Sequence, residues 1–204
     1  MSDQYRKEQY RLAAWEGNIP PYTVFVDIET TGLDPQEDIV LEVAMVALSP
    51  QAQVLYELSY PVSISNPEDF IREPIVLKMH QDNGLLHDCK HSGITLAVVE
   101  DDFCKAMEAL QERFPDYQSP MAGSSVHFDR AFLKGHMPHF ENKFHRRNID
   151  VSSLKEVFRR HAPWVVEEFE RDFKAHKTHR ALGDVYVTID EYWRYARLIE
   201  RGAA

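Results

Sequence analysis

The sequence predicts an α/β fold in which a mixed β-sheet is flanked by α-helices, and three observations carry this prediction. Strand-like runs follow one another at residues 23–29, 39–50 and 53–62. From residue 103 onward, apolar residues recur at helical spacing. Between two of these helical segments stands "PMAG", which fits a short strand or a turn. Strands first, with helices after and between them, indicate a sheet covered by helices.

The three strand-like runs differ in how completely they are apolar. "TVFVDIETTGLDP" begins with β-branched and aromatic residues and ends in a turn supplied by Gly32 and Asp34-Pro35. "IVLEVAMVALSP" is apolar on both faces but has a Glu inside it, and "QVLYELSYPV" follows after a Ser-Pro-Gln turn. We therefore expect three adjacent strands.

The predicted helices rest on spacing and on end signals. Phe103, Met107, Leu110 and Phe114 mark one buried helical face, which Pro115 ends. Ser124 or Ser125 can cap a helix that starts near Val126. Ser153 with Glu156 matches a capping box for a helix that continues to Ala162-Pro163. The last helix has an apolar face made of Leu182, Val185 or Tyr186, Ile189, Tyr192, Trp193 and Ala196.

The 204 residues contain no Gly/Ser- or Pro-rich linker, so residues 22–204 are interpreted as one domain. Residues 1–21 are interpreted as an N-terminal extension with a short helix that ends at Pro20-Pro21. They lack the apolar segment of a signal peptide, and no run approaches the roughly 18 apolar residues of a membrane span. Cys89 and Cys104 form no C-x-x-C motif. These features predict a soluble, cytoplasmic protein with reduced thiols.

The formal net charge is −10, from 23 basic and 33 acidic residues. This is the wrong sign for a protein that holds long nucleic acid through many phosphate contacts. Any polyanion that the protein binds is therefore expected to be short or to be met by metal ions.

Asp27 and Glu29 lie two residues apart near the end of the first strand. Side chains alternate across a strand, so both carboxylates leave the same face. Two adjacent anions are either solvated or neutralised, and oxygen ligands of this kind suit Mg²⁺ or Mn²⁺. The alternative for so short a motif is a solvated strand end.

Further candidates lie in "GSSVHFDRAFL" and "THRALGDVYV". Asp129 falls in the first turns of a predicted helix, where its alternative role is to interact with the helix dipole. His179 and Asp184 are five residues apart and would not share a face of one helix. We therefore expect His179 on a loop or first turn and Asp184 inside the helix.

These residues together resemble the DEDDh exonucleases of the ribonuclease H-like fold. The stretches "VDIETTGLDP", "SSVHFDRAFLKGHMPHFENKFHRRNIDVSSLKEV" and "THRALGDV" are similar to oligoribonucleases, which degrade very short RNA, and the resemblance begins near Thr23. It implies an exonuclease that removes nucleoside 5′-monophosphates from the 3′ end with two divalent ions, Mg²⁺ or Mn²⁺. The implied metal-binding acids are Asp27, Glu29, Asp129 and Asp184, and the implied general base is His179.

The resemblance also implies how the substrate is held. A cap on the 5′-phosphate, partly supplied by a second subunit of a homodimer, is expected because arginine and hydroxyl groups suit phosphate. The alternatives are that the serines cap a helix, that the arginine is a surface charge and that Leu33 fills the core. The implied substrate residues are Leu33 under the terminal bases, His80, and Ser125, Arg147, Ser152 and Ser153 at the cap.

Two positions depart from the family pattern. Arg146-Arg147-Asn148 stands where these enzymes usually have Tyr-Arg-Tyr, and Ile75 stands at the place of a stacking tryptophan. Stacking on an aromatic ring contributes about 1–3 kcal/mol per base, so the grip on dinucleotides is expected to be looser. Arg146 can compensate by attracting phosphate.

Three alternatives remain open at the level of sequence. The same fold and site can act on single-stranded DNA or on longer RNA 3′ ends. The domain can also bind metal or nucleic acid without catalysis, or serve protein contacts alone. Loss of one of the four acids or of His179 would favour the two non-catalytic alternatives, and the sequence retains all five residues.

Overall fold

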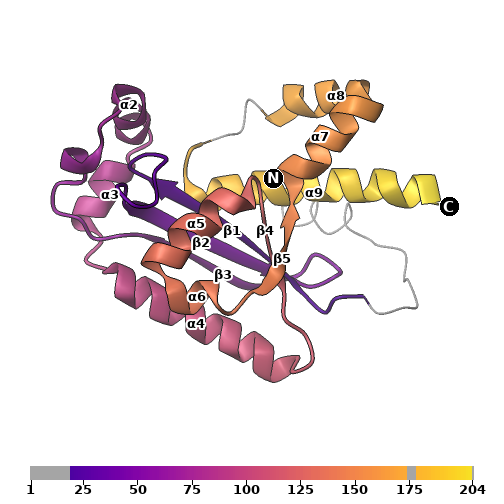
Figure 1. Cartoon of the computed structure of the whole chain (residues 1–204), viewed down its shortest axis with the longest axis horizontal. Coiled ribbons are helices and arrows are strands. Elements are labelled where there is room, and N and C mark those ends of the chain that lie inside the picture. Colours follow the sequence, from indigo (N-terminus) through magenta and orange to yellow (C-terminus); the bar gives the residue numbers. More distant parts are fainter. Residues whose placement is uncertain (1–18, 174–177, 204) are drawn as a thin grey trace.

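The computed structural model describes residues 19–173 and 178–203, and the helix expected before Pro20 falls outside them. A five-stranded sheet with the order β3-β2-β1-β4-β5 forms the centre of the molecule (Figure 1). β1 pairs antiparallel with β2 and parallel with β4, which makes the sheet mixed, as predicted. The strands are β1 (Thr23–Thr30), β2 (Val40–Leu48), β3 (Val54–Pro61), β4 (Pro120–Gly123) and β5 (His145–Asp150).

The four predicted helices are present, and further helices surround them. The helix expected around Phe103 is α4 (Leu96–Arg113), and the other three are α5 (Val126–His136), α7 (Val151–His161) and α9 (Ala181–Ala203). The sequence analysis assigned no structure to β5 or to five other elements. These five are η1 (Pro67–Phe70), α2 (Pro74–Asp82), α3 (Leu85–His91), α6 (Pro138–Glu141) and α8 (Pro163–Phe173).

Ser125 takes the expected N-cap position before α5 without capping it, and the expected cap at Ser153 was wrong. Ser125 precedes α5, but its side chain makes no cap hydrogen bond and its φ is 62°, in the left-handed region. α7 begins at Val151, two residues before Ser153, and its cap is Asp150, whose carboxylate accepts from the Ser152 amide. An acid at the N-cap satisfies a free helix amide as a serine would, and this shifts the helix start.

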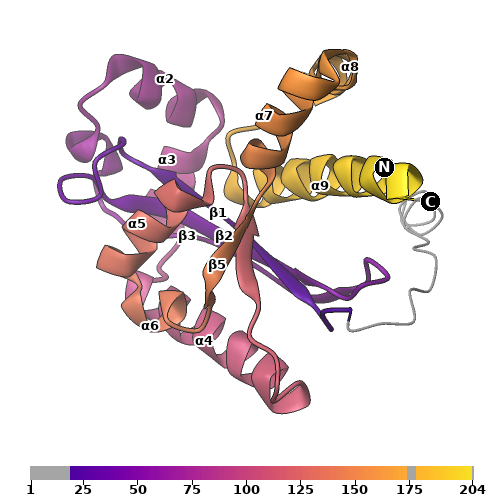
Figure 2. The ribbon, with the colours of Figure 1, turned by 45° about the vertical axis from the view of Figure 1, so that its right-hand side comes forward.

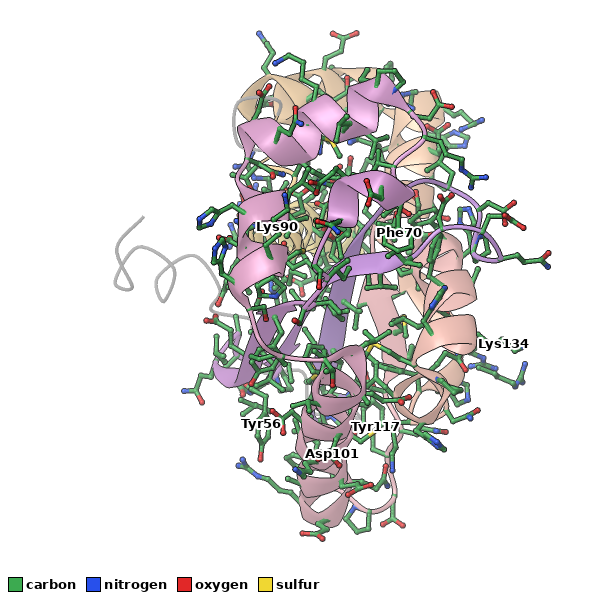
Figure 3. The ribbon with its side chains drawn as sticks, turned by 90° about the vertical axis from the view of Figure 1, so that its left-hand side faces the viewer. Tyr56, Phe70, Lys90, Asp101, Tyr117 and Lys134 are labelled. Carbon is green, nitrogen blue, oxygen red and sulfur yellow. The ribbon has the colours of Figure 1, made fainter. Side chains whose placement is uncertain are left out.

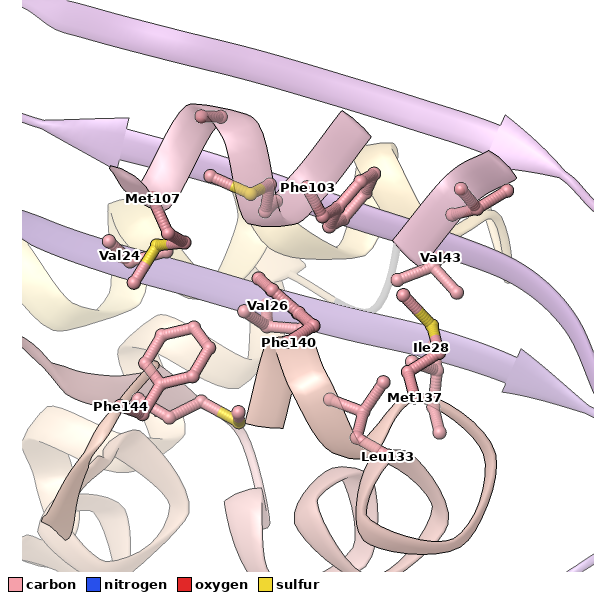
Figure 4. Packing of buried hydrophobic residues seen from close by; sticks show 14 of the residues in the cluster. Val24, Val26, Ile28, Val43, Phe103, Met107, Leu133, Met137, Phe140 and Phe144 are labelled. Carbon is pink, nitrogen blue, oxygen red and sulfur yellow. The ribbon is translucent and has the colours of Figure 1, made fainter. Parts of the chain in front are cut away.

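Two apolar clusters cover opposite faces of the sheet. Val24, Val26 and Ile28 of β1 pack with α4, α5 and α6, and the close view shows Phe103 and Phe140 over these strand residues (Figure 4). Phe25 points to the other face, where it packs in a cluster with residues of α9. Figure 2 shows α4 and α9 on either side of the sheet.

This alternation decides which elements meet the acids of β1. Asp27 and Glu29 continue the side of the strand that begins with Phe25, so they face α9 rather than α4. α9 packs on β1 and β2. The predicted acid pair therefore points toward the helix that contains Asp184.

A small helical layer covers one end of the molecule (Figure 3). Phe70 of η1 and Lys90 of α3 both lie at this end, and Lys90 Nζ is 2.7 Å from Glu68 Oε1. The layer also contacts β2 through α3. None of the described helices combines the length and apolar character that crossing a membrane requires.

Candidate active site

Three carboxylates converge where β1 meets the start of α9. One oxygen from each of Asp27, Glu29 and Asp184 lies within 4.8 Å of the others. Asp27 and Asp184 are partly exposed and Glu29 is buried, so the cluster opens to solvent on one side. Hard divalent cations take such oxygen ligands, and this donor set fits Mg²⁺ or Mn²⁺.

Glu29 shows the electrostatic cost of this arrangement. Burial, followed by the negative charges of Asp184, Glu42 and Asp129, raises the pKa of Glu29 to about 8, while Arg180 acts in the opposite direction. The charged form of Glu29 is therefore disfavoured in the metal-free protein. A bound cation would reverse this preference, which is the behaviour expected of a metal ligand.

Asp129 comes from the other side of the sheet, on the first turns of α5, as predicted. It is 3% exposed, and burial raises its pKa to about 8, although the amides of Asp129 itself and of Ile28 act in the opposite direction. Its negative charge contributes to the raised pKa of Glu29. It does not belong to the three residues whose oxygens converge within 4.8 Å.

His179 lies just before α9 on an exposed loop, where the sequence analysis expected it. Its φ of 50° is left-handed, an uncommon conformation for a residue with a side chain. The side-chain amide of Asn83 donates to its carbonyl. His179 is therefore an exposed loop residue, five positions before Asp184.

His80 does not lie on the surface. It is fully buried, with Nε2 3.0 Å from the Thr30 carbonyl and 4.0 Å from Glu29 Oε2. Since a carbonyl only accepts, Nε2 carries the proton. Burial lowers the pKa of His80 and so favours its neutral form. Its position beside Glu29 suits a role in holding that carboxylate in place. Direct substrate contact by His80 stays a prediction.

Ser125 and Ser152 come together as the predicted cap requires. Their hydroxyls are 3.3 Å apart, and the Ser125 amide lies 3.1 Å from Ser152 Oγ. Asp150 joins them, because its Oδ1 accepts from the Ser125 amide at 3.0 Å and from the Ser152 hydroxyl at 2.6 Å. The start of α5 and the start of α7 are thereby tied together.

The remaining predicted cap residues are exposed. Arg146 and Arg147 lie on β5, an edge strand, and neither guanidinium pairs with another residue of the described chain. Ser153 is exposed on the first turn of α7. These side chains are available to a phosphate or to a second subunit.

Leu33 and Ile75 are the most exposed large apolar residues of the described chain, at 81% and 79%. Their exposure contradicts the alternative in which Leu33 fills the core. Arg72, which precedes α2, bonds to Asp38 at 3.1 Å, and Asp38 accepts from the Asp34 amide at 2.9 Å in the loop that contains Leu33. The two apolar side chains thus belong to segments that are bonded to each other.

Two residues that border the acids, Glu42 and Arg180, were not predicted from the sequence. Glu42 is 3% exposed on β2, directly opposite Glu29, and it forms a salt bridge with Arg180. The available signal was the acid inside "IVLEVAMVAL", because a charge within a buried strand requires a partner. The partner was not evident from the sequence, since 138 residues separate the two.

The fold matches solved structures of other proteins. A crystal structure of E. coli exonuclease I in complex with a dT13 oligonucleotide matches with a TM-score of 0.56 and 17% identity, over 88% of this chain. This chain spans 43% of the exonuclease I chain. The Mg²⁺- and Mn²⁺-bound form of S. pombe Pop2p matches with a TM-score of 0.59 and 12% identity, over 85% of this chain and 82% of that one.

Sequence comparisons extend the match to the level of a family. The family model described as "Exonuclease" matches residues 24–192, which include all five predicted catalytic positions. Oligoribonuclease of Pseudomonas aeruginosa is 34% identical over 86% of this chain and 94% of its own length. Oligoribonuclease of Shewanella loihica is 36% identical over 91% of this chain and 97% of its own length. The chain therefore belongs to the exonuclease family, within its oligoribonuclease branch.

Proposed function

We propose that this protein is a divalent-metal-dependent 3′-to-5′ exoribonuclease that degrades short single-stranded RNA to nucleoside 5′-monophosphates. The convergence of Asp27, Glu29 and Asp184 carries the proposal, because three carboxylate oxygens within 4.8 Å of one another suit a divalent cation, whose charge would stabilise their ionised forms. Residues 22–204 form the proposed single exonuclease domain.

Each catalytic residue has one role in this proposal. Asp27, Glu29, Asp129 and Asp184 hold two ions, Mg²⁺ or Mn²⁺. When bound, these ions supply the charge that activates a water molecule and stabilises the leaving 3′-oxygen. His179 takes the proton of the attacking water and releases it to solvent, a role that an imidazole beside a reacting water can fill.

The far end of the substrate meets a different set of residues. Ser125, Ser152, Ser153 and Arg147 hold the 5′-phosphate, partly across the interface of a homodimer, and Arg146 adds positive charge. Leu33 packs against the terminal bases. Cys89 and Cys104 are free thiols, which fits a cytoplasmic enzyme.

A second candidate function is cleavage of single-stranded DNA or of longer RNA 3′ ends. The observation that favours it is the exposed aliphatic Ile75 where oligoribonucleases usually stack a base on an aromatic ring. An aliphatic surface gives less stacking energy and less discrimination of short substrates. The catalytic residues would be the same.

A time course with Mn²⁺ or Mg²⁺ on 5′-labelled RNAs of about two, five and twenty nucleotides, beside equal DNAs, tests both functions. Fast loss of the dinucleotide with slow attack on the twenty-mer is expected.

Asp27→Asn should abolish hydrolysis, and His179→Ala should lower the rate of hydrolysis by about 10²- to 10⁴-fold while the affinity for Mn²⁺ persists. His161→Ala, on the exposed end of α7, is the matched control. Preference for DNA or the twenty-mer would favour the second function, and full activity of Asp27→Asn would exclude both.

A further inference from the structure

A buried ion pair fixes the beginning of α9 to the middle of the sheet. The Glu42 side chain is 4% exposed, and the Arg180 guanidinium bonds to both of its oxygens, with Nη2 at 2.9 Å from Oε1 and Nε at 3.1 Å from Oε2. Glu42 Oε2 also accepts from the Ala181 amide at 2.8 Å. A paired, planar contact of this kind fixes both position and orientation.

Arg180 also reaches two other elements. Its Nη1 lies 2.9 Å from Asp88 Oδ2 on α3 and 3.4 Å from the Asn83 carbonyl at the end of α2. One side chain therefore joins β2, α2 and α3 to the first turn of α9. Three contacts from separate elements leave the segment around Arg180 little freedom to move.

The residues on either side of Arg180 are those that the proposed reaction uses. His179 precedes it, and the Asp184 amide bonds to the Arg180 carbonyl at 3.0 Å. The left-handed backbone of His179 is unfavourable for a residue with a side chain and persists only where the surroundings enforce it. The Asn83 side-chain amide on the His179 carbonyl and the anchored Arg180 that follows it supply that enforcement.

We propose that Glu42, Arg180 and Asn83 are positioning residues, which hold His179 and Asp184 in place against the acids of β1. The inference rests on the proposed function, and the three residues act through His179 and Asp184 without touching substrate. Glu42 is directly opposite Glu29 in the strand register, so the anchor of α9 and the metal-binding acids share one pair of strands. The alternative is that the ion pair stabilises the fold and nothing more.

Removing one partner alone would leave a buried charge, and such a variant can fail to fold. The test therefore replaces both, as Glu42→Met with Arg180→Met. A displacement of about 1 Å can cost about 10²-fold in rate, so kcat is expected to fall by about that factor while KM changes by less than about threefold. Arg180→Lys, which keeps the charge but not the fork, is expected to lie between the wild type and the double variant.

The matched control is a second ion pair on the same helix. Lys155 of α7 lies 3.0 Å from Glu191 of α9, whose side chain is 9% exposed. Lys155→Met with Glu191→Met removes a comparable pair, and its kcat is expected to stay near that of the wild type. Equal losses in both double variants would mean that any ion pair of α9 has this effect, and would overturn the inference.

Asn83 offers a finer substitution. Its Oδ1 accepts from the Leu85 amide at 3.0 Å, while its Nδ2 donates to His179. Asn83→Asp keeps the acceptor for the Leu85 amide, so the turn before α3 is preserved, and it replaces the donor to the His179 carbonyl with a negatively charged oxygen, so the contact with His179 is lost. A fall in kcat is expected, and unchanged kcat would remove Asn83 from the proposal.

Hydrogen–deuterium exchange of the metal-free protein gives a readout that does not depend on turnover. Faster exchange across residues 178–184 is expected in the Glu42/Arg180 double variant but not in the control. Unchanged exchange, or faster exchange with unchanged kcat, would overturn the inference. If the wild type does not hydrolyse RNA with Mn²⁺ or Mg²⁺, the proposed function fails, and the exchange data still decide whether the anchor holds this segment.

Discussion

Glu29 and Asp129 are two buried acids whose surroundings favour the neutral form. Burial is the largest cause for both, and the pKa of each is raised to about 8. In the unfolded chain these acids ionise near pH 4, so the folded protein holds protons that the unfolded chain has released. Each acid therefore makes the metal-free fold less stable as the pH rises from about 4 to about 8.

Glu29→Gln should consequently stabilise the metal-free protein at alkaline pH. The glutamine cannot ionise, so the gain in the free energy of unfolding is expected to reach at least about 1 kcal/mol at pH 9 and to vanish near pH 4. Urea unfolding in EDTA at both pH values measures it, with the exposed Glu112→Gln as control. A loss of stability at pH 9 would contradict the electrostatic account.

At the scale of elements, most of what was predictable came from apolar periodicity. β1, β2 and β3 were predictable because short apolar runs such as "TVFV" and "IVLEVAMVAL" bury their side chains best as strands. β5 was missed because "HRRNID" is an exposed edge strand whose residues are mostly polar, so no apolar alternation marks it. α2 has only His80 among its buried residues, and Pro74 at its first position gave only a start signal. α3 buries Leu85, Leu86 and Cys89, but it has only seven residues, too few to show a helical period.

The residues of the candidate site likewise fall into those that local sequence patterns predict and those that they do not. Asp27, Glu29, Asp129, His179 and Asp184 were predictable because each lies in a recognisable local motif. Glu42 with Arg180, and Asp150 with Ser125, were not, because these bonds join segments 138 and 25 residues apart. Such bonds depend on the tertiary fold, and no local spacing indicates them.

Asp150 supports a prediction at this scale, because it joins α5 and α7. Asp150→Ala removes the cap of α7 and is expected to lower the free energy of unfolding by about 0.5–2 kcal/mol. It should also release the Ser125–Ser152 pair, and so raise KM for a 5′-phosphorylated dinucleotide more than for its 5′-hydroxyl form. Asp150→Asn keeps the acceptor oxygen and is the control. Equal changes in KM for both dinucleotides would exclude a role for this pair in holding phosphate.

For the whole molecule, the sheet order places the acids at a point where the chain changes direction. β1 is central, and its neighbours β2 and β4 run in opposite senses, so the chain leaves β1 toward β2 and returns later on the other side through β4. In open α/β sheets, ligands bind at the carboxyl ends of strands at such a point. Asp27, Glu29 and the start of α5 all lie there. Arg147, by contrast, lies on the edge strand β5, where a second copy of the chain has access.

Subunit complementation tests whether the cap is shared across the proposed homodimer. Asp27→Asn should inactivate its own site, and Arg147→Ala should impair the site that its Arg147 serves. In an equal, fully exchanged mixture, half of the dimers contain one subunit of each variant. If Arg147 serves the partner's site, one of the two sites in each mixed dimer has intact acids and an intact cap. About a quarter of wild-type activity on 5′-phosphorylated dinucleotides is then expected. If Arg147 serves its own subunit, the mixture should show only the average activity of the two parent variants.

Sedimentation of the wild type at assay concentration provides the matching physical measurement, and an active monomer would exclude a shared cap.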